Sequence, residues 1–232
     1  MKNTVKMLLL FPMLICAQSN FEKAEKLFIQ RNYTAAKPLF ENILKGSPNN
    51  LKTIEYLGDI AGYAKDWDRC IFYYEKLKKT KPNEASYYYK YGGALGMKAK
   101  EGGKWVAITL IGDMKESFEK AIILNPNHIE ARWALIEYYL QLPALFGGSE
   151  RKAQKYADEL FKISPVDGFL SKGHIDEYFE RYKSAEKNYV KAIEVGGSKV
   201  TYERLEELYR VKLLQPEKAL RVIENYKERN KS

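Results

Sequence analysis

The sequence predicts an all-α protein made of stacked helix pairs, and an internal repeat is the main reason. Pro48 and Pro82 stand 34 residues apart, and the residues before the two prolines match in size and polarity. The matched pairs are Tyr33 with Trp67, Ala36 with Cys70, Phe40 with Tyr74, and Ile43 with Leu77. A period of this length is typical of one helix–turn–helix unit, which buries its apolar face only against a neighbouring unit.

The repeat continues to the end of the chain, with two insertions. Its ending recurs 44 residues after Pro82 and again 39 residues later, so the third unit holds about ten extra residues and the fourth about five. A fifth unit carries a glycine where proline would stand, and a sixth is weaker. The recurring residues are Phe118, Ala121 and Pro126; Ala153, Leu160 and Pro165; Gly173, Ala185, Tyr189 and Ala192; and Leu205, Leu208, Ala219 and Ile223.

In the second unit, Leu57-Gly58 and Ala61 occupy the signature positions of the first helix. This pattern resembles the tetratricopeptide-repeat (TPR) family, in which small residues let helices cross closely and a proline ends the second helix. The resemblance covers about residues 20–230. It implies a right-handed α-solenoid of about five to six helix-turn-helix repeats over residues 18–232, at about 17–50, 51–84, 85–128, 129–167, 168–199 and 200–232.

The first residues have the layout of a secretory signal peptide, which we expect to span residues 1–17. Lys2 and Lys6 give a positive start, residues 7–15 (MLLLFPMLI) form an apolar run, and Ala17 is a small residue at a plausible cleavage site. A helical run of this length spans only about 14 Å, well short of a bilayer core of roughly 30 Å, and Pro12 interrupts it. We therefore expect a periplasmic or secreted protein without an integral membrane span after cleavage. Lipidation at Cys16 is the alternative, although the residues before it match a bacterial lipobox poorly.

The cysteines and the charge constrain the chemistry further. Cleavage after Ala17 leaves Cys70 as the one remaining cysteine, so packing rather than a disulfide holds the exported chain together. Cys70 itself is expected to be a small core residue. The formal net charge is +9, but the lysines alternate with glutamates, as on solvated helix faces. We therefore expect no nucleic-acid partner.

The two insertions are the most individual feature of the chain. In residues 96–113, Gly102-Gly103 marks a turn, and the apolar stretch after it suggests that both helices of the third repeat are lengthened. Trp105 is then a candidate partner contact. Residues 142–149 (LPALFGGS) predict a compact loop that resembles a segment of other bacterial TPR proteins. Both insertions either elaborate the packing or frame a binding site.

Enzyme motifs are missing from the sequence. His128 and His174 lie in different repeats with no further ligand at metal-binding spacing, and there is no nucleophile elbow, phosphate loop or dinucleotide fingerprint. We expect a non-catalytic protein without catalytic residues, metal or cofactor.

The first helices of successive repeats line the concave groove of TPR proteins, where extended or helical peptides bind. The predicted groove residues are Glu55, Asp59, Tyr89, Trp133, Glu137 and His174. This lining is acidic and aromatic, and it lacks the lysines and asparagines of a carboxylate clamp. We therefore expect a protein or peptide ligand of basic and aromatic or aliphatic character, anchored by Trp133 and Tyr89. An error of one residue in register would instead turn these two aromatics into core residues.

Three function classes remain open. The first is a protein–protein interaction scaffold or adaptor that binds a partner segment in the groove, in the bacterial cell envelope. The alternative is a structural subunit of an envelope or outer-membrane assembly complex, docked through its convex face or the Trp105 region. The third is a binder of anionic surfaces, which would need lysines clustered on one face and would show steep salt dependence. The sequence does not indicate the partner or the oligomeric state.

Overall fold

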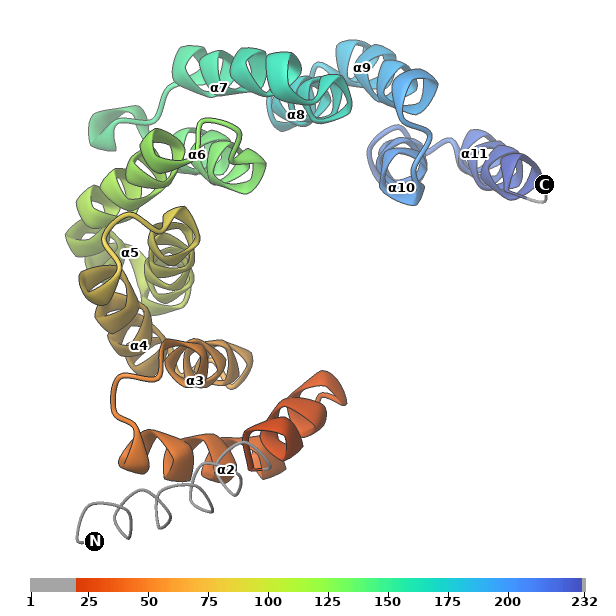
Figure 1. Ribbon diagram of the computed structural model, residues 1–232. Coiled ribbons are helices and arrows are strands. Elements are labelled where there is room, and N and C mark those ends of the chain that lie inside the picture. The colour runs from red at the N-terminus through yellow and green to blue at the C-terminus, as the bar shows by residue number, and fades with distance from the viewer. Residues whose placement is uncertain (1–19, 231–232) are drawn as a thin grey trace, which may run out of the picture. The chain divides into compact units, whose positions relative to one another are not determined.

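The structure is a computed structural model that describes residues 20–230, and this part of the chain is helical throughout, with no strand (Figure 1). The expected signal peptide at residues 1–17, with the alternative lipidation site Cys16, lies outside the described residues. The chain divides into two compact units, the first ending at Ser117 and the second beginning at Phe118. The boundary falls inside one helix, α5.

The first unit is a series of helix pairs. Residues 20–29 are helical, and the following helices are α2 (Tyr33–Gly46), α3 (Leu51–Tyr63), α4 (Trp67–Thr80) and the long element α5 (Ala85–Leu124), whose end lies in the second unit. The second unit continues with α6 (Ile129–Gln141), the 3₁₀ turn η1 (Ala144–Phe146), α7 (Glu150–Ile163), α8 (Pro165–Tyr178), α9 (Tyr182–Val195), α10 (Lys199–Glu207), the π-helical turn η2 (Leu208–Lys212) and α11 (Pro216–Arg229).

Polar side chains set the helix starts. Asn32, Asn50, Asp66, His128, Ser149 and Ser164 each precede a helix and accept a hydrogen bond from a backbone N–H of its first turn. Such caps satisfy donors that have no partner within the helix. The turn between the two helices of a repeat contains a left-handed residue in all six repeats, namely Arg31, Lys65, Gly103, Gly147, Glu180 and Leu214.

Close helix crossings depend on small residues, as the sequence predicts. A Cβ at Gly58 would lie 2.7 Å from the ring of Tyr74, and one at Gly173 would lie 2.4 Å from the ring of Tyr189. The two glycine–tyrosine pairs hold the helices of the second and fifth repeats together. Cys70 is buried and unpaired, which confirms its expected place in the core.

The first insertion lengthens both helices of the third repeat, as the sequence predicts. The two helices of α5 meet at Gly103, whose φ of 79° favours glycine. They fold back on each other, and this brings Gly96 close to Met114. A Cβ at Gly96 would lie 3.1 Å from the sulfur of Met114. Both are longer than α3, which has 13 residues. Glu101, just before the turn at Gly103, contacts Lys65 and Trp67 at the turn of the preceding repeat.

The second insertion is a compact loop. The carbonyl of Pro143 accepts hydrogen bonds from the N–H groups of Phe146 and Gly148, and Gly147 adopts a φ of 97°. The proline that follows, Pro165, differs from Pro48 and Pro82: it is the first residue of α8 rather than part of a turn between helices. Proline suits this position because the first helical N–H needs no partner within the helix. Ser164 alone separates α7 from α8.

Candidate functional site

The predicted groove residues lie on the first helices of their repeats and are half-buried. Glu55 and Asp59 lie on α3, Tyr89 on the first part of α5, Trp133 and Glu137 on α6, and His174 on α8. None of them is a core residue, and none is fully exposed. Tyr89 and Trp133 are half-buried rather than core residues. Whether these residues bind a partner stays a prediction.

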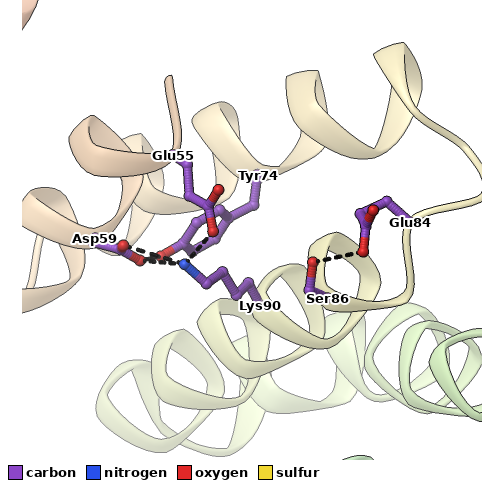
Figure 2. Close-up of polar contacts among 6 residues, drawn as sticks. All are labelled: Glu55, Asp59, Tyr74, Glu84, Ser86 and Lys90. Carbon is purple, nitrogen blue, oxygen red and sulfur yellow. Dashed lines mark hydrogen bonds and ion pairs between the residues drawn. The ribbon is translucent and has the colours of Figure 1, made fainter. Parts of the chain in front are cut away.

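In the first unit, Lys90 joins the two predicted carboxylates into one cluster (Figure 2). Its Nζ lies 2.7 Å from Oε1 of Glu55, and 2.9 and 3.1 Å from the two carboxylate oxygens of Asp59. The hydroxyl of Tyr74, on α4, donates to Oδ1 of Asp59 at 2.5 Å. The same figure shows the separate contact at the start of α5, where the hydroxyl of Ser86 donates to Glu84. The cluster thus links α3, α4 and α5.

Lys90 keeps its positive charge at neutral pH. Burial would lower the pKa of Lys90, but the charges and hydrogen bonds of Asp59 and Glu55 outweigh it and raise this pKa. Burial and the neighbouring Asp59 raise the pKa of Tyr74, so its hydroxyl remains a donor. One lysine faces two carboxylates, which leaves the cluster one negative charge in excess.

A similar arrangement lies one repeat earlier. Oε1 of Glu25 accepts from Nζ of Lys52 at 2.8 Å and from the hydroxyl of Tyr56 at 2.6 Å. The hydrogen bond from Lys52, followed by that from Tyr56, holds the pKa of Glu25 below its usual value. In both places a carboxylate on one first helix is paired with a cation from the next repeat and with a tyrosine. These pairs couple neighbouring repeats.

The second unit brings together three of the predicted residues. The Nε2 of His174 lies 2.5 Å from Oε1 of Glu137, and the rings of His174 and Trp133 are 6.2 Å apart. The close contact with His174 is the main cause that lowers the pKa of Glu137. Trp133 Nε1 donates to Oδ1 of Asp167 at 2.9 Å, and the indole also packs against the C-terminal core of this unit. The aromatic anchor is therefore oriented by the protein itself.

Two predicted contacts stand apart from these clusters. Tyr89 is half-buried next to Lys90 along α5, between the core residues Tyr87 and Tyr91. Trp105 is 86% exposed and lies just after the turn at Gly103. It belongs to neither of the two groups of first-helix residues.

Lys90, Tyr74 and Asp167 are not among the groove residues that the sequence predicts. Their spacings carry a usable signal. Lys90 follows Glu55 by 35 residues and Asp59 by 31, and Asp167 follows Trp133 by 34. These distances are close to one repeat, so they indicate pairing between equivalent helices of adjacent repeats. An acidic residue followed one repeat later by a basic one is thus a sign of a coupling between repeats.

Within residues 20–230, no group of three or more histidine, cysteine or acidic side chains is placed to hold a metal ion. No helix in the same range is long and apolar enough to cross a membrane.

Comparisons with known proteins show the fold. No family model matches this chain, and no curated protein does either. Solved structures do match. The thermophilic TPR protein TTC0263 of Thermus thermophilus has a TM-score of 0.65 at 16% identity, over 84% of this chain and all of that one.

Two further structures are similar. PilW, described as a widely conserved type IV pilus biogenesis factor, has a TM-score of 0.64 at 14% identity, over 89% of this chain and 90% of that one. YrrB, described as a TPR protein with an unusual peptide-binding site, has a TM-score of 0.53 at 16% identity, over 78% of this chain and 87% of that one. The chain therefore has the all-helical fold of tetratricopeptide-repeat proteins.

Proposed function

We propose that this chain is a non-catalytic scaffold that binds a segment of a partner protein on its first-helix face, in the bacterial cell envelope. The observation that carries the proposal is that each unit has half-buried carboxylates and aromatic rings on its first helices. Side chains in this state are ordered by their neighbours and still reach solvent, as a preformed binding surface requires.

The chemistry of the face favours a partner with basic and apolar side chains. In the second unit, Glu137 offers a carboxylate beside the rings of Trp133 and His174. Tryptophan is enriched at interface hot spots, and a carboxylate at its side selects a cation. In the first unit, the excess carboxylate charge around Lys90 gives the same preference. A partner cation there would share or replace Lys90.

The envelope location is supported by the first residues of the sequence, which have the layout of a signal peptide. The similarity to YrrB is compatible with peptide binding, although an identity of 16% supports only the fold. No feature of residues 20–230 calls for catalysis, and the proposal includes none.

The test is affinity capture from an envelope extract of the source organism, using the chain expected after cleavage, residues 18–232. The altered protein carries Trp133→Ala and Glu137→Lys. A matched control carries Val195→Ala and Glu194→Lys, which change an exposed apolar residue and an exposed carboxylate at the end of α9. Circular dichroism establishes that both variants are folded, and the captured protein is then purified and its affinity measured directly.

We expect a partner that binds the parent and the α9 control equally and binds the Trp133/Glu137 variant at least tenfold more weakly, as for loss of a hot spot. Equal binding by all three proteins would refute the first-helix site. Absence of any partner would refute the scaffold function.

The second candidate function is a structural subunit of an envelope assembly complex. Two features favour it: the similarity in fold to PilW and the exposed Trp105, which belongs to neither of the first-helix clusters. A partner lost on Trp105→Ala and kept on Trp133→Ala would support this alternative over the scaffold.

A further inference from the structure

The turns that join the two helices of each repeat carry exposed apolar side chains in the first unit. Ile29 is 73% exposed, Tyr63 62% and Trp105 86%. Each lies within two residues of the left-handed turn residue of its own repeat, Arg31, Lys65 or Gly103. Scattered exposed apolar residues are ordinary, but one at the same turn of three consecutive repeats forms a row.

Side-chain contacts show that these three turns are neighbours in space. The ring of Tyr63 stacks on that of Tyr33, with 4.4 Å between centroids. Lys65 Nζ lies 3.5 Å from Oε1 of Glu101, and Trp67 Nε1 donates to Oε2 of Glu101 at 2.7 Å. We call residues 29–32, 63–66 and 100–105 together the turn edge of the first unit.

The turn edge carries an excess of positive charge. Its acidic residues are already engaged: Glu101 with Lys65, and Asp66 with Arg69 and the first turn of α4. Arg31, Lys100 and Lys104 are exposed, and no ion pair to a carboxylate is found for any of them among residues 20–230. Two of these unpaired cations, Lys100 and Lys104, precede Trp105, the most exposed tryptophan of the chain.

We propose that the turn edge of the first unit docks on the surface of an anionic lipid bilayer. Tryptophan and tyrosine have an apolar body and a polar tip, which suits the headgroup region of a membrane. Lysines near them gain about 1 kcal/mol each from an anionic surface. The apolar groups stand on separate turn tips, a spacing that suits a fluid surface that can adapt to each side chain.

The geometry of α5 supports the same occupant. Lys104 and Trp105 directly follow Gly103, at the turn between the two lengthened helices of the third repeat. An exposed lysine and the exposed indole are therefore adjacent in the sequence at this turn. This membrane docking concerns residues outside the first-helix clusters, and it stands or falls separately from the proposed scaffold function.

The test is co-sedimentation of residues 18–232 with vesicles. The expected signal peptide is left out because its apolar run would itself bind lipid. We expect binding to phosphatidylcholine vesicles with about 30 mol% phosphatidylglycerol, weak binding to pure phosphatidylcholine, and weakening in about 0.5 M salt. The emission of Trp105 should shift to shorter wavelength on binding, and the shift should be missing in Trp105→Phe.

Two altered proteins locate the contact. Lys100→Glu with Lys104→Glu should lower the partition into anionic vesicles by at least about 25-fold, because two attractive charges are lost and two repulsive charges are added. Trp105→Ala should lower it roughly tenfold. The matched control is Lys45→Glu with Lys81→Glu, which reverses two exposed lysines near the opposite ends of α2 and α4. It should change the partition less than about threefold.

Three outcomes would overturn the proposal. The first is a folded parent that does not bind anionic vesicles. The second is an equal loss in the Lys45/Lys81 control, which would mean attraction by net charge alone. The third is undiminished binding by Trp105→Ala together with an unchanged emission of Trp105.

Discussion

The indole Nε1 of Trp133 in α6 donates a hydrogen bond to Oδ1 of Asp167 in α8, 2.9 Å away and one repeat later in the sequence. Asp167 has a second role in the same place. Its Oδ2 accepts from the hydroxyl of Ser164 at 2.6 Å, and its N–H donates to the same hydroxyl at 3.3 Å. The start of α8 and the orientation of Trp133 are therefore coupled through one carboxylate.

This coupling can be measured with a double-mutant cycle of Trp133→Phe and Asp167→Ala. Each change alone should lower the free energy of unfolding by about 1–2 kcal/mol, because one removes the donor and the other removes the acceptor and part of the cap. The two together should cost about 1 kcal/mol less than the sum. Urea unfolding checks this, with Ser164→Ala as a variant that removes the cap and keeps the indole contact. A strictly additive cycle would show that the hydrogen bond contributes nothing to stability.

The glycine–tyrosine crossings predict a contrast between three glycines. Gly58→Ala and Gly173→Ala place a methyl group 2.7 and 2.4 Å from a tyrosine ring, so each should destabilise the protein by about 1–3 kcal/mol. Gly93→Ala meets nothing within 4 Å in a helix and should stabilise by about 0.5–1 kcal/mol. Thermal unfolding of the three variants measures this. Equal effects at all three positions would mean that the close crossings are not required.

The pair of Glu137 and His174 predicts a dependence of stability on pH. The pKa of Glu137 is lowered in the folded protein, from the ordinary value of 4.5, chiefly by the close contact with His174. Because the folded pKa lies below the unfolded one, the carboxylate stabilises the protein above about pH 4.5, and this contribution is lost as the pH falls. Glu137→Gln should therefore lower the melting temperature at pH 6, and the difference from the parent should shrink at pH 4. A difference that grows on acidification would contradict this.

Lys90 predicts a test of the carboxylate cluster. Lys90→Met leaves Glu55 and Asp59 half-buried without their cation, which should cost about 2 kcal/mol. Asp59→Asn in the Lys90→Met background should recover part of the loss, because one uncompensated charge disappears. Urea unfolding of the two variants gives the answer. If the second change adds to the loss instead, the hydrogen bond from Tyr74 matters more than the charge.

Cys70 should be inert in the folded protein. Burial is the main cause that raises the pKa of its thiol to about 11, so the reactive thiolate is scarce at neutral pH. A disulfide reagent at pH 8 should label Cys70 only after unfolding, and much faster in urea than in buffer. Rapid labelling of the folded chain would show that the core of the second repeat opens often.

The fold was accessible from the sequence because its determinants recur every 34 residues or so. Gly58, Tyr74 and Cys70 pack within one helix pair, and such local packing leaves a repeated pattern of residue size. Pro165 is harder to interpret, since proline serves equally at a turn and at the first position of a helix. Only the length of the helix that follows distinguishes a proline in a turn from a proline at the first position of a helix.

The site was accessible only in part. The position of Glu55 and Asp59 on a first helix follows from the repeat, but their partner Lys90 depends on how far two first helices are shifted along each other. Lys90 directly follows Tyr89, the residue that the periodicity places in the lining. A shift of one residue along the helix changes an aromatic contact into an ion pair, and residue periodicity does not resolve that shift.

Ser164, the one residue between α7 and α8, also has a kinetic consequence. Its N–H bonds to Leu160 at the end of α7, while its carbonyl and hydroxyl accept from the first turn of α8. Because Ser164 is hydrogen-bonded to both helices, the end of α7 cannot unfold without disrupting the start of α8. Amide protons on both sides of this joint should exchange with deuterium as a single cooperative group, so the fourth and fifth repeats share one opening event.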